Sequence, residues 1–193
     1  MSLLALLAAL ATLVAAPAFA QDDTPFAGGR IGLEAGWGRV GGGDRIGGDG
    51  FVYGGTLGYD FAFGQVRVGP EVEIAGSTQK TCIALPAGGR ADSTCQRTDR
   101  DLYAGGRLGY VVNPSVLLYA KVGYSNARFK DRFEGNGPDL PAPFHRDHDG
   151  VRAGAGLEYA LTPQLSLTGE YRYSHYSDDI HQNQILAGVA YRF

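Results

Sequence analysis

The most regular feature of the chain is an alternation of apolar residues with small or polar ones. In the stretch NQILAGVAYRF, every second residue is apolar or aromatic, and the positions between are smaller or more polar. Strict alternation predicts a β-strand with two different faces. The pattern recurs upstream in residues 30–39, 51–61, 65–75, 102–110, 115–124, 151–161 and 165–173. We therefore predict eight strands of about 9–11 residues each, the length of a tilted strand that crosses a bilayer.

The connections between these segments alternate between short and long. Tight turns are predicted at residues 60–64, 113–114 and 162–164, where Gly, Pro, Asn and Asp provide suitable turn chemistry. Polar loops are predicted at residues 39–50, 75–98 and 126–149, with a shorter one at 176–182. This asymmetry is typical of outer-membrane barrels, which have tight periplasmic turns and long outer loops.

One face of the predicted strands carries nearly all of their charge. In a soluble sandwich that face would meet water, whereas in an eight-stranded transmembrane barrel it fills the interior. Because an isolated buried charge is costly, we predict that most of these side chains form a partnered network. The predicted interior charges are Glu34, Arg67, Glu71, Glu73, Arg107, Lys121, Arg152, Glu158, Glu170, Arg172 and Arg192.

Two features favour the transmembrane interpretation. The charged face is rich in Gly, which makes room for long side chains on a concave wall but gains nothing on a water-exposed strand. The apolar face ends in aromatic residues at both ends of the strands, as expected for girdles at two membrane interfaces. These predicted girdle residues are Trp37, Phe51, Tyr53, Tyr59, Phe61, Tyr110, Tyr124, Tyr159 and Tyr173.

The predicted fold is therefore all-β, an eight-stranded antiparallel up-and-down transmembrane barrel. The last strand should close against the first, because closure removes sheet edges that lipid could not satisfy. Its final residues, Tyr191 and Phe193, belong to the periplasmic girdle. They also resemble the C-terminal insertion signal of bacterial outer-membrane proteins, an alternating strand that ends in aromatic-x-Phe.

The first twenty residues have the pattern of a secretory signal. An apolar core precedes Ala18-Phe19-Ala20, a small-x-small cleavage pattern, although the usual basic residue near Met1 is missing. A retained membrane anchor is the alternative, but the core is short for a span and a polar run follows it. We expect cleavage after residue 20 and a barrel domain over residues 21–193.

Cysteine content, charge and glycine spacing bear on a disulfide, on nucleic-acid binding and on a collagen-like repeat. Cys82 and Cys95 lie close in sequence, so one disulfide is expected in an exported protein; it would stabilise the fold by roughly 3 kcal/mol in the chain-entropy model. The formal net charge of -3 gives no basic field for nucleic acid. The 30 glycines follow no collagen period.

The chain resembles the small outer-membrane β-barrel proteins of Gram-negative bacteria (the OmpA-like, opacity-type "porin family"). The closest stretches are DLYAGGRLGYVVNPSVLLYAKVGY, GVRAGAGLEYALTPQLSLTGEYRYSHY and QNQILAGVAYRF. The resemblance implies an outer-membrane location, a monomer without cofactor, contact with membrane lipid and lipopolysaccharide, and insertion by the barrel-assembly machinery. Two-domain OmpA-type proteins continue into a peptidoglycan-binding domain, which we do not expect in a chain that ends at Phe193.

Several motifs give only weak indications of nucleotide binding, metal binding or catalysis. The run GRVGGGDRIGGDG lacks the Lys-Ser/Thr of a phosphate loop. His145 and His148, like His175 and His181, have no third metal ligand placed by sequence, so solvated loops are the favoured interpretation. An acid–base pair of Glu158 and Glu170 is conceivable, but pairing with interior arginines is favoured.

The predicted role is structural support of the outer membrane and presentation of surface loops. Alternatives are a narrow channel for small solutes, a surface adhesin or receptor, and, least favoured, a barrel enzyme such as a lipase or palmitoyl transferase. An eight-stranded interior is just wide enough for side chains to fill, which argues against a wide pore.

Overall fold

The computed structural model describes residues 24–42, 45–78, 80–84, 93–134, 144–177 and 180–193. Those residues form strands and turns, and among them there is no helix long and apolar enough to cross a membrane. The strands are β1 (Gly28–Gly42), β2 (Arg45–Phe63), β3 (Val66–Ser77), β4 (Lys80–Ala84), β5 (Ser93–Asn113), β6 (Val116–Glu134), β7 (Phe144–Ala160), β8 (Leu165–Tyr176) and β9 (Ile180–Arg192).

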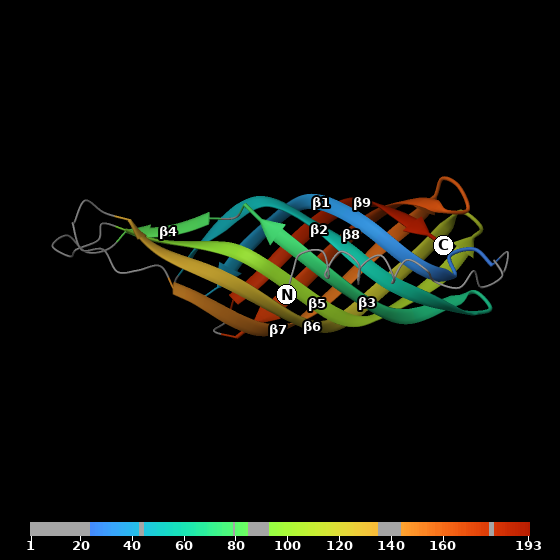
Figure 1. Cartoon of the computed structure of the whole chain (residues 1–193), viewed down its shortest axis with the longest axis horizontal. Coiled ribbons are helices and arrows are strands. Elements are labelled where there is room, and N and C mark those ends of the chain that lie inside the picture. Colours follow the sequence, from blue (N-terminus) through green and yellow to red (C-terminus); the bar gives the residue numbers. More distant parts are fainter. Residues whose placement is uncertain (1–23, 43–44, 79, 85–92, 135–143, 178–179) are drawn as a thin grey trace, which may run out of the picture.

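Eight of these strands close into an antiparallel barrel, as predicted (Figure 1). The order β3-β2-β1-β9-β8-β7-β6-β5 becomes circular because β3 also pairs with β5. The seam between β1 and β9 runs from the pair Arg30 and Arg192 to the pair Gly41 and His181. The last strand thus pairs with the first, and neither needs to leave backbone groups unpaired towards lipid.

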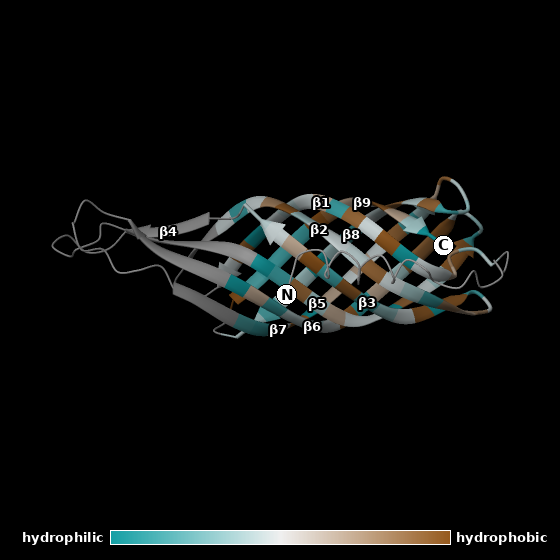
Figure 2. Cartoon of the chain, in the orientation of Figure 1, coloured by the Kyte–Doolittle hydropathy of each residue, from teal (hydrophilic) through white to brown (hydrophobic). Residues whose placement is uncertain are grey.

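The two faces of the wall are inverted relative to those of a soluble protein. Leu33 is 67% exposed and Ile185 68%, whereas Arg152 and Glu158 are fully buried. Figure 2 shows hydrophobic and hydrophilic residues alternating along the barrel strands. Alternation places the apolar side chains outside and the charged ones in the lumen, which is the arrangement that a surrounding bilayer requires.

The three tight turns lie where they were predicted, together at one end of the barrel, but residues 60–63 of the first belong to β2 and the turn itself is residues 64–65. They connect β2 to β3, β5 to β6 and β7 to β8, and the chain's last residue, Phe193, lies at the same end (Figure 1). We call this the turn end and the opposite one the hairpin end.

The predicted strand lengths and long loops are wrong. The barrel strands have 12 to 21 residues, because β5, β6 and their neighbours continue past the width of a bilayer. The loop predicted at 75–98 contains β4 and the start of β5, and β5 pairs with β6 as far as Ser93 and Glu134. Backbone pairing therefore extends into the projecting hairpins, where the polar sequence suggested irregular loops.

Beyond the hairpin end, β4, β5, β6 and β7 form a sheet that projects from the barrel (Figure 1). Within it, Cys82 and Cys95 are direct cross-strand partners. Cα atoms of directly opposed antiparallel residues are about 4.5–5.5 Å apart, within the range that a disulfide spans. The predicted disulfide fits this register and stays a prediction, as does the signal peptide, which lies outside the described residues.

Candidate functional site in the barrel interior

The lumen is filled by a network of charged side chains. Ten of the eleven predicted interior charges take part in ion pairs. The exception is Arg67, which donates instead to the carbonyls of Pro25, Gly64 and Val66 at 2.7–2.9 Å. Among the described residues, Arg67 has no carboxylate within ion-pair distance.

The half of the network towards the hairpin end is organised around Glu73. Its Oε2 lies 3.2 Å from Arg152 Nη1 and 3.1 Å from Arg172 Nη1, and Lys121 contacts its other oxygen. Arg172 also donates to Glu34 and Glu170, each at 2.7 Å. One carboxylate thus receives cations from β6, β7 and β8.

The half towards the turn end is organised around Asp60 and Glu158. Arg107 bridges them, with Nη1 2.8 Å from Asp60 and Nη2 2.7 Å from Glu158. Arg192 repeats the bridge at 2.9 and 3.0 Å. Ser166 donates a further hydrogen bond to Glu158 at 2.8 Å. Two arginines and two carboxylates therefore form a closed ring of ion pairs.

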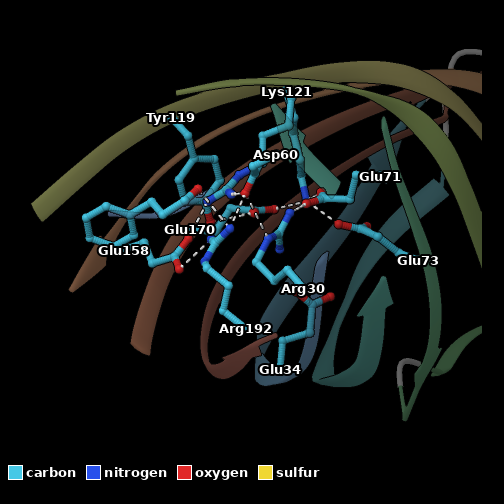
Figure 3. A network of polar contacts seen from close by, with 12 residues as sticks. Arg30, Glu34, Asp60, Glu71, Glu73, Tyr119, Lys121, Glu158, Glu170 and Arg192 are labelled. Atoms are coloured by element: carbon cyan, nitrogen blue, oxygen red, sulfur yellow. Dashed lines mark hydrogen bonds and ion pairs between the residues drawn. The ribbon is translucent and has the colours of Figure 1, made fainter. Parts of the chain in front are cut away.

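Glu71 joins the two halves (Figure 3). It contacts Arg30 on one side and accepts from Lys121 at 3.1 Å on the other. Lys121 lies 2.6 Å from Glu170, and Arg30 lies 3.5 Å from Asp60. The ion pairs therefore form one continuous network along the lumen.

Three members of the network were missed by the sequence analysis. Arg30 is the first residue of a predicted strand but was not counted among the interior charges, Asp60 was assigned to a turn, and Asp101 lies just upstream of a predicted strand. All three lie within longer strands, on the face of their charged neighbours, and are less than 5% exposed. Extending the alternation by one or two positions would have found them.

With these three, the described interior holds seven basic side chains and seven carboxylates, so its formal charge is zero. Balance matters because a buried charge without a partner costs several kcal/mol. The basic residues are Arg30, Arg67, Arg107, Lys121, Arg152, Arg172 and Arg192, and the acidic ones are Glu34, Asp60, Glu71, Glu73, Asp101, Glu158 and Glu170.

Interior tyrosines satisfy further polar groups. The Tyr119 hydroxyl donates to Glu170 at 2.8 Å, and the Arg107 guanidinium lies 3.9 Å from the centre of its ring. Near the hairpin end, the Tyr176 hydroxyl donates to Asp101 at 3.1 Å and accepts from Arg152 at 3.0 Å. Such contacts hold the guanidinium groups in fixed positions.

Glycine makes room for this network where strands crowd together. Gly105 and Gly123 are direct cross-strand partners, and a Cβ at Gly123 would lie 2.4 Å from the Ala104 carbonyl oxygen. A Cβ at Gly156 would lie 2.7 Å from the Tyr119 hydroxyl. The Gly-rich pattern of the charged face therefore has a steric cause.

A small cavity of about 20 Å³ lies within the network and is lined by residues of β1, β2, β3, β6, β8 and β9. It has room for about one water molecule, for which roughly 10–15 Å³ suffices. Arg30 Nε and Glu34 Oε1, both from residues that line the cavity, have no hydrogen-bond partner among the described residues. The space is too small for a solute larger than water.

The predicted girdle residues all point outwards. Each of the nine is between 39% and 57% exposed. Tyr59 and Phe61 pack with ring centroids 4.7 Å apart near the turn end, and Trp37 and Phe51 are cross-strand partners near the hairpin end. The placement at two levels is that of aromatic belts at two membrane interfaces.

The C-terminal residues lie at the seam between the first and last strands. Tyr191 is paired with Ile31, and the Phe193 amide donates to the Gly29 carbonyl at 3.1 Å. Both aromatic side chains are about half exposed on the outer wall. The final residue is thereby tied to the strand that completes the barrel.

The weaker motifs do not converge on a reactive centre. Glu158 and Glu170 have separate arginine partners, Arg107 for the first and Arg172 for the second. His175 and His181 are cross-strand partners with stacked rings. Within the described parts of the chain, no group of three or more His, Cys, Asp or Glu residues could hold a metal ion.

Comparison with known proteins identifies the family. A family model, "Outer membrane protein beta-barrel domain", matches residues 6–193. The chain belongs to this family. It is a protein of the bacterial outer membrane, so its turn end faces the periplasm and its hairpin end the exterior.

Its relatives include two Brucella proteins. The 31 kDa outer-membrane immunogenic protein of Brucella melitensis is 28% identical over 182 residues, 82% of this chain and 75% of that protein. The 25 kDa outer-membrane immunogenic protein of Brucella ovis is 36% identical over 87 residues, 45% of this chain. That match spans 40% of the length of the 25 kDa relative.

Solved structures share the fold. The attachment invasion locus protein Ail of Yersinia pestis superposes with a TM-score of 0.57 at 20% identity, covering 87% of this chain and all of that one. Neisserial surface protein A superposes with a TM-score of 0.61 at 18% identity, covering 86% of this chain and 98% of that one. At these identities the likeness establishes the architecture alone.

Proposed function

We propose that this barrel is a structural protein of the outer membrane with a closed lumen, rather than a channel or an enzyme. The observation that carries the proposal is the ion-pair network of six basic and seven acidic side chains that runs along the interior and whose charge is balanced when Arg67 is included. A channel for solutes needs a continuous water-filled path, and this network occupies that path with side chains bound to one another.

Burial supports the same conclusion. Arg152, Glu158 and Arg172 are fully buried, although each lies in the wall of the lumen. An open pore would leave such side chains hydrated, as the polar interiors of larger porins are. The cavity inside the network, about 20 Å³, is close to the size of a single water molecule.

The decisive experiment is single-channel recording of the purified protein in a planar bilayer. We expect no steady ion current, because passage would require several ion pairs to separate at once. A reproducible open conductance of the native protein would refute the structural proposal in favour of the narrow channel.

A second function, presentation of surface hairpins to external partners, is favoured by one observation. The sheet of β4, β5, β6 and β7 projects beyond the barrel at the extracellular end (Figure 1). The names of both Brucella relatives describe them as immunogenic, which fits a surface-exposed segment. Antibody against residues 93–97, which pair with β4 in the projecting sheet, should label intact cells; label appearing only after the cells are broken would contradict surface presentation.

The partners expected for this role remain proposals. The exposed apolar wall and its aromatic belts fit membrane lipid and lipopolysaccharide. The alternating final strand fits recognition by the barrel-assembly machinery. A closed barrel with no free sheet edge in its wall fits a monomer.

A further inference from the structure

The segment before β1 enters the periplasmic end of the lumen. Residues 24–27 form a turn in which the Ala27 amide donates to the Thr24 carbonyl at 3.3 Å. Phe26 within it is only 5% exposed, in a protein whose other large apolar side chains mostly face outwards. Its ring belongs to a buried cluster with Val111 and Leu117, and the partly buried Ala160 packs against that cluster. We call residues 24–27 the N-terminal plug.

The residues around Phe26 form an apolar patch at the turn end, on the adjacent strands β5, β6 and β7. Val111 is the interior residue next to the turn between β5 and β6, and Leu117 lies just after that turn and is fully buried. Ala160 is the last residue of β7. On this side of the barrel the charged interior thus gives way to apolar side chains at the periplasmic mouth, and the Phe26 ring packs against them.

Two arginines hold the plug by its backbone. Arg67 Nε donates to the Pro25 carbonyl at 2.9 Å, and Arg192 Nη1 donates to the Phe26 carbonyl at 2.9 Å. The same Arg192 nitrogen lies 2.9 Å from Asp60, so the plug is bonded directly to the ion-pair network. Arg67 is the one predicted interior charge without a carboxylate partner among the described residues, and here it binds the plug.

The backbone of Phe26 is strained. Its φ of 61° makes it the one non-glycine residue with positive φ among the described residues. An aromatic residue in the left-handed region is unfavourable and persists only when its surroundings stabilise it. Burial of the ring and the two carbonyl bonds supply that compensation.

We propose that Phe26 seals the periplasmic mouth of the lumen and keeps the ion-pair network dry. The seal matters because ion pairs weaken when water reaches them, since the effective dielectric constant rises. The ring of Arg107, Asp60, Glu158 and Arg192 lies nearest to this mouth and is protected most directly. The inference rests on the proposed closed lumen but concerns water access rather than ion flow.

The test measures access of a charged, membrane-impermeant maleimide to a cysteine placed beside the ring. The protein carries Cys82→Ser and Cys95→Ser, so that no native thiol reacts, and Ala160→Cys as the probe. It is isolated from outer membranes and reconstituted in nanodiscs, which leave both ends of the barrel open to solvent. Gln65→Cys, in an exposed periplasmic turn, gives the labelling rate of an accessible thiol.

We expect the Ala160→Cys thiol to react at least tenfold more slowly than Gln65→Cys. Adding Phe26→Gly should raise its rate to near that of Gln65→Cys, because glycine accepts the positive φ but leaves the mouth empty. The matched control Phe26→Leu should preserve protection, since it keeps an apolar side chain. Retention of the folded, heat-resistant band on unboiled gels shows that each variant still forms a barrel.

Equal protection in the Phe26→Gly and Phe26→Leu variants would overturn the proposal, as would rapid labelling of Ala160→Cys beside native Phe26. Planar-bilayer recording tests the closed lumen separately from the Phe26 seal. A current in the native protein would contradict the closed lumen, whereas slow labelling reversed by Phe26→Gly would still support the seal.

Discussion

Arg107 on β5 donates a hydrogen bond to Glu158 on β7 at 2.7 Å, although β6 lies between these two strands in the wall. The two residues are 51 positions apart in sequence, and both are buried. Their contact crosses the interior instead of following the sheet. Ion pairs of this type bind together strands that are not neighbours in the wall, so they should stabilise the barrel.

Glu158→Ala should destabilise the barrel by about 3–5 kcal/mol, because it leaves Arg107 and Arg192 without one of their shared carboxylates. The measurement is the temperature at which the folded band disappears on unboiled gels, together with conductance in planar bilayers. We expect a lower temperature, with or without a new leak.

The exposed pair of Arg39 and Asp49 provides the control. Its side chains are 73% and 39% exposed, so Asp49→Ala should leave the unfolding temperature unchanged. If the native barrel conducts steadily and Glu158→Ala alters neither conductance nor unfolding temperature, the lumen is an open channel.

Gly123→Ala should destabilise the barrel by about 1–3 kcal/mol, the usual cost of overpacking. The new Cβ would lie 2.4 Å from the Ala104 carbonyl oxygen and from the Gly105 Cα, which belong to the paired backbone and cannot move away freely. Gly106→Ala is the matched control, because no atom lies within 4 Å of its added Cβ. Denaturant titration should show a lower midpoint for the first variant only; equal midpoints would refute the steric account.

Phe193→Asp should reduce the amount of folded protein in the outer membrane. The aromatic side chain lies on the outer wall beside the closing seam, where a carboxylate would meet the membrane interface. Phe63→Asp is an informative comparison, since Phe63 is also an exposed aromatic at the turn end but lies on β2. Quantitative immunoblots of outer-membrane fractions test this, and a loss of equal size in both variants would remove any special role for the last residue.

Cys82 and Cys95 should form an intramolecular disulfide that is dispensable for insertion. Their strands pair in the projecting sheet beyond the barrel, so the bond would not contribute to the wall. Mass spectrometry of the unreduced protein should show a mass two hydrogens below that of the reduced form. Two free thiols would disprove the bond, and a Cys82→Ser/Cys95→Ser variant that fails to insert would disprove its dispensability.

The sequence by itself determined the class of fold and the direction of each face. Alternation with period two placed Arg107 and Glu158 on the inner face and Leu33 and Tyr59 on the outer one, because successive side chains of a strand point to opposite sides. Short turns rich in Gly, Pro and Asn marked the periplasmic end. These are local properties, so they are readable from neighbouring residues.

Tertiary structure alone decided which charges meet. Contact between β5 and β7 depends on the stagger of strands around a closed barrel, which no local pattern encodes. The same reason explains why Arg67 binds backbone carbonyls instead of a carboxylate, and why Phe26 fills the mouth of the lumen. The strands also extend beyond their apolar portions. Backbone pairing can continue outside the bilayer, where outward side chains need not be apolar.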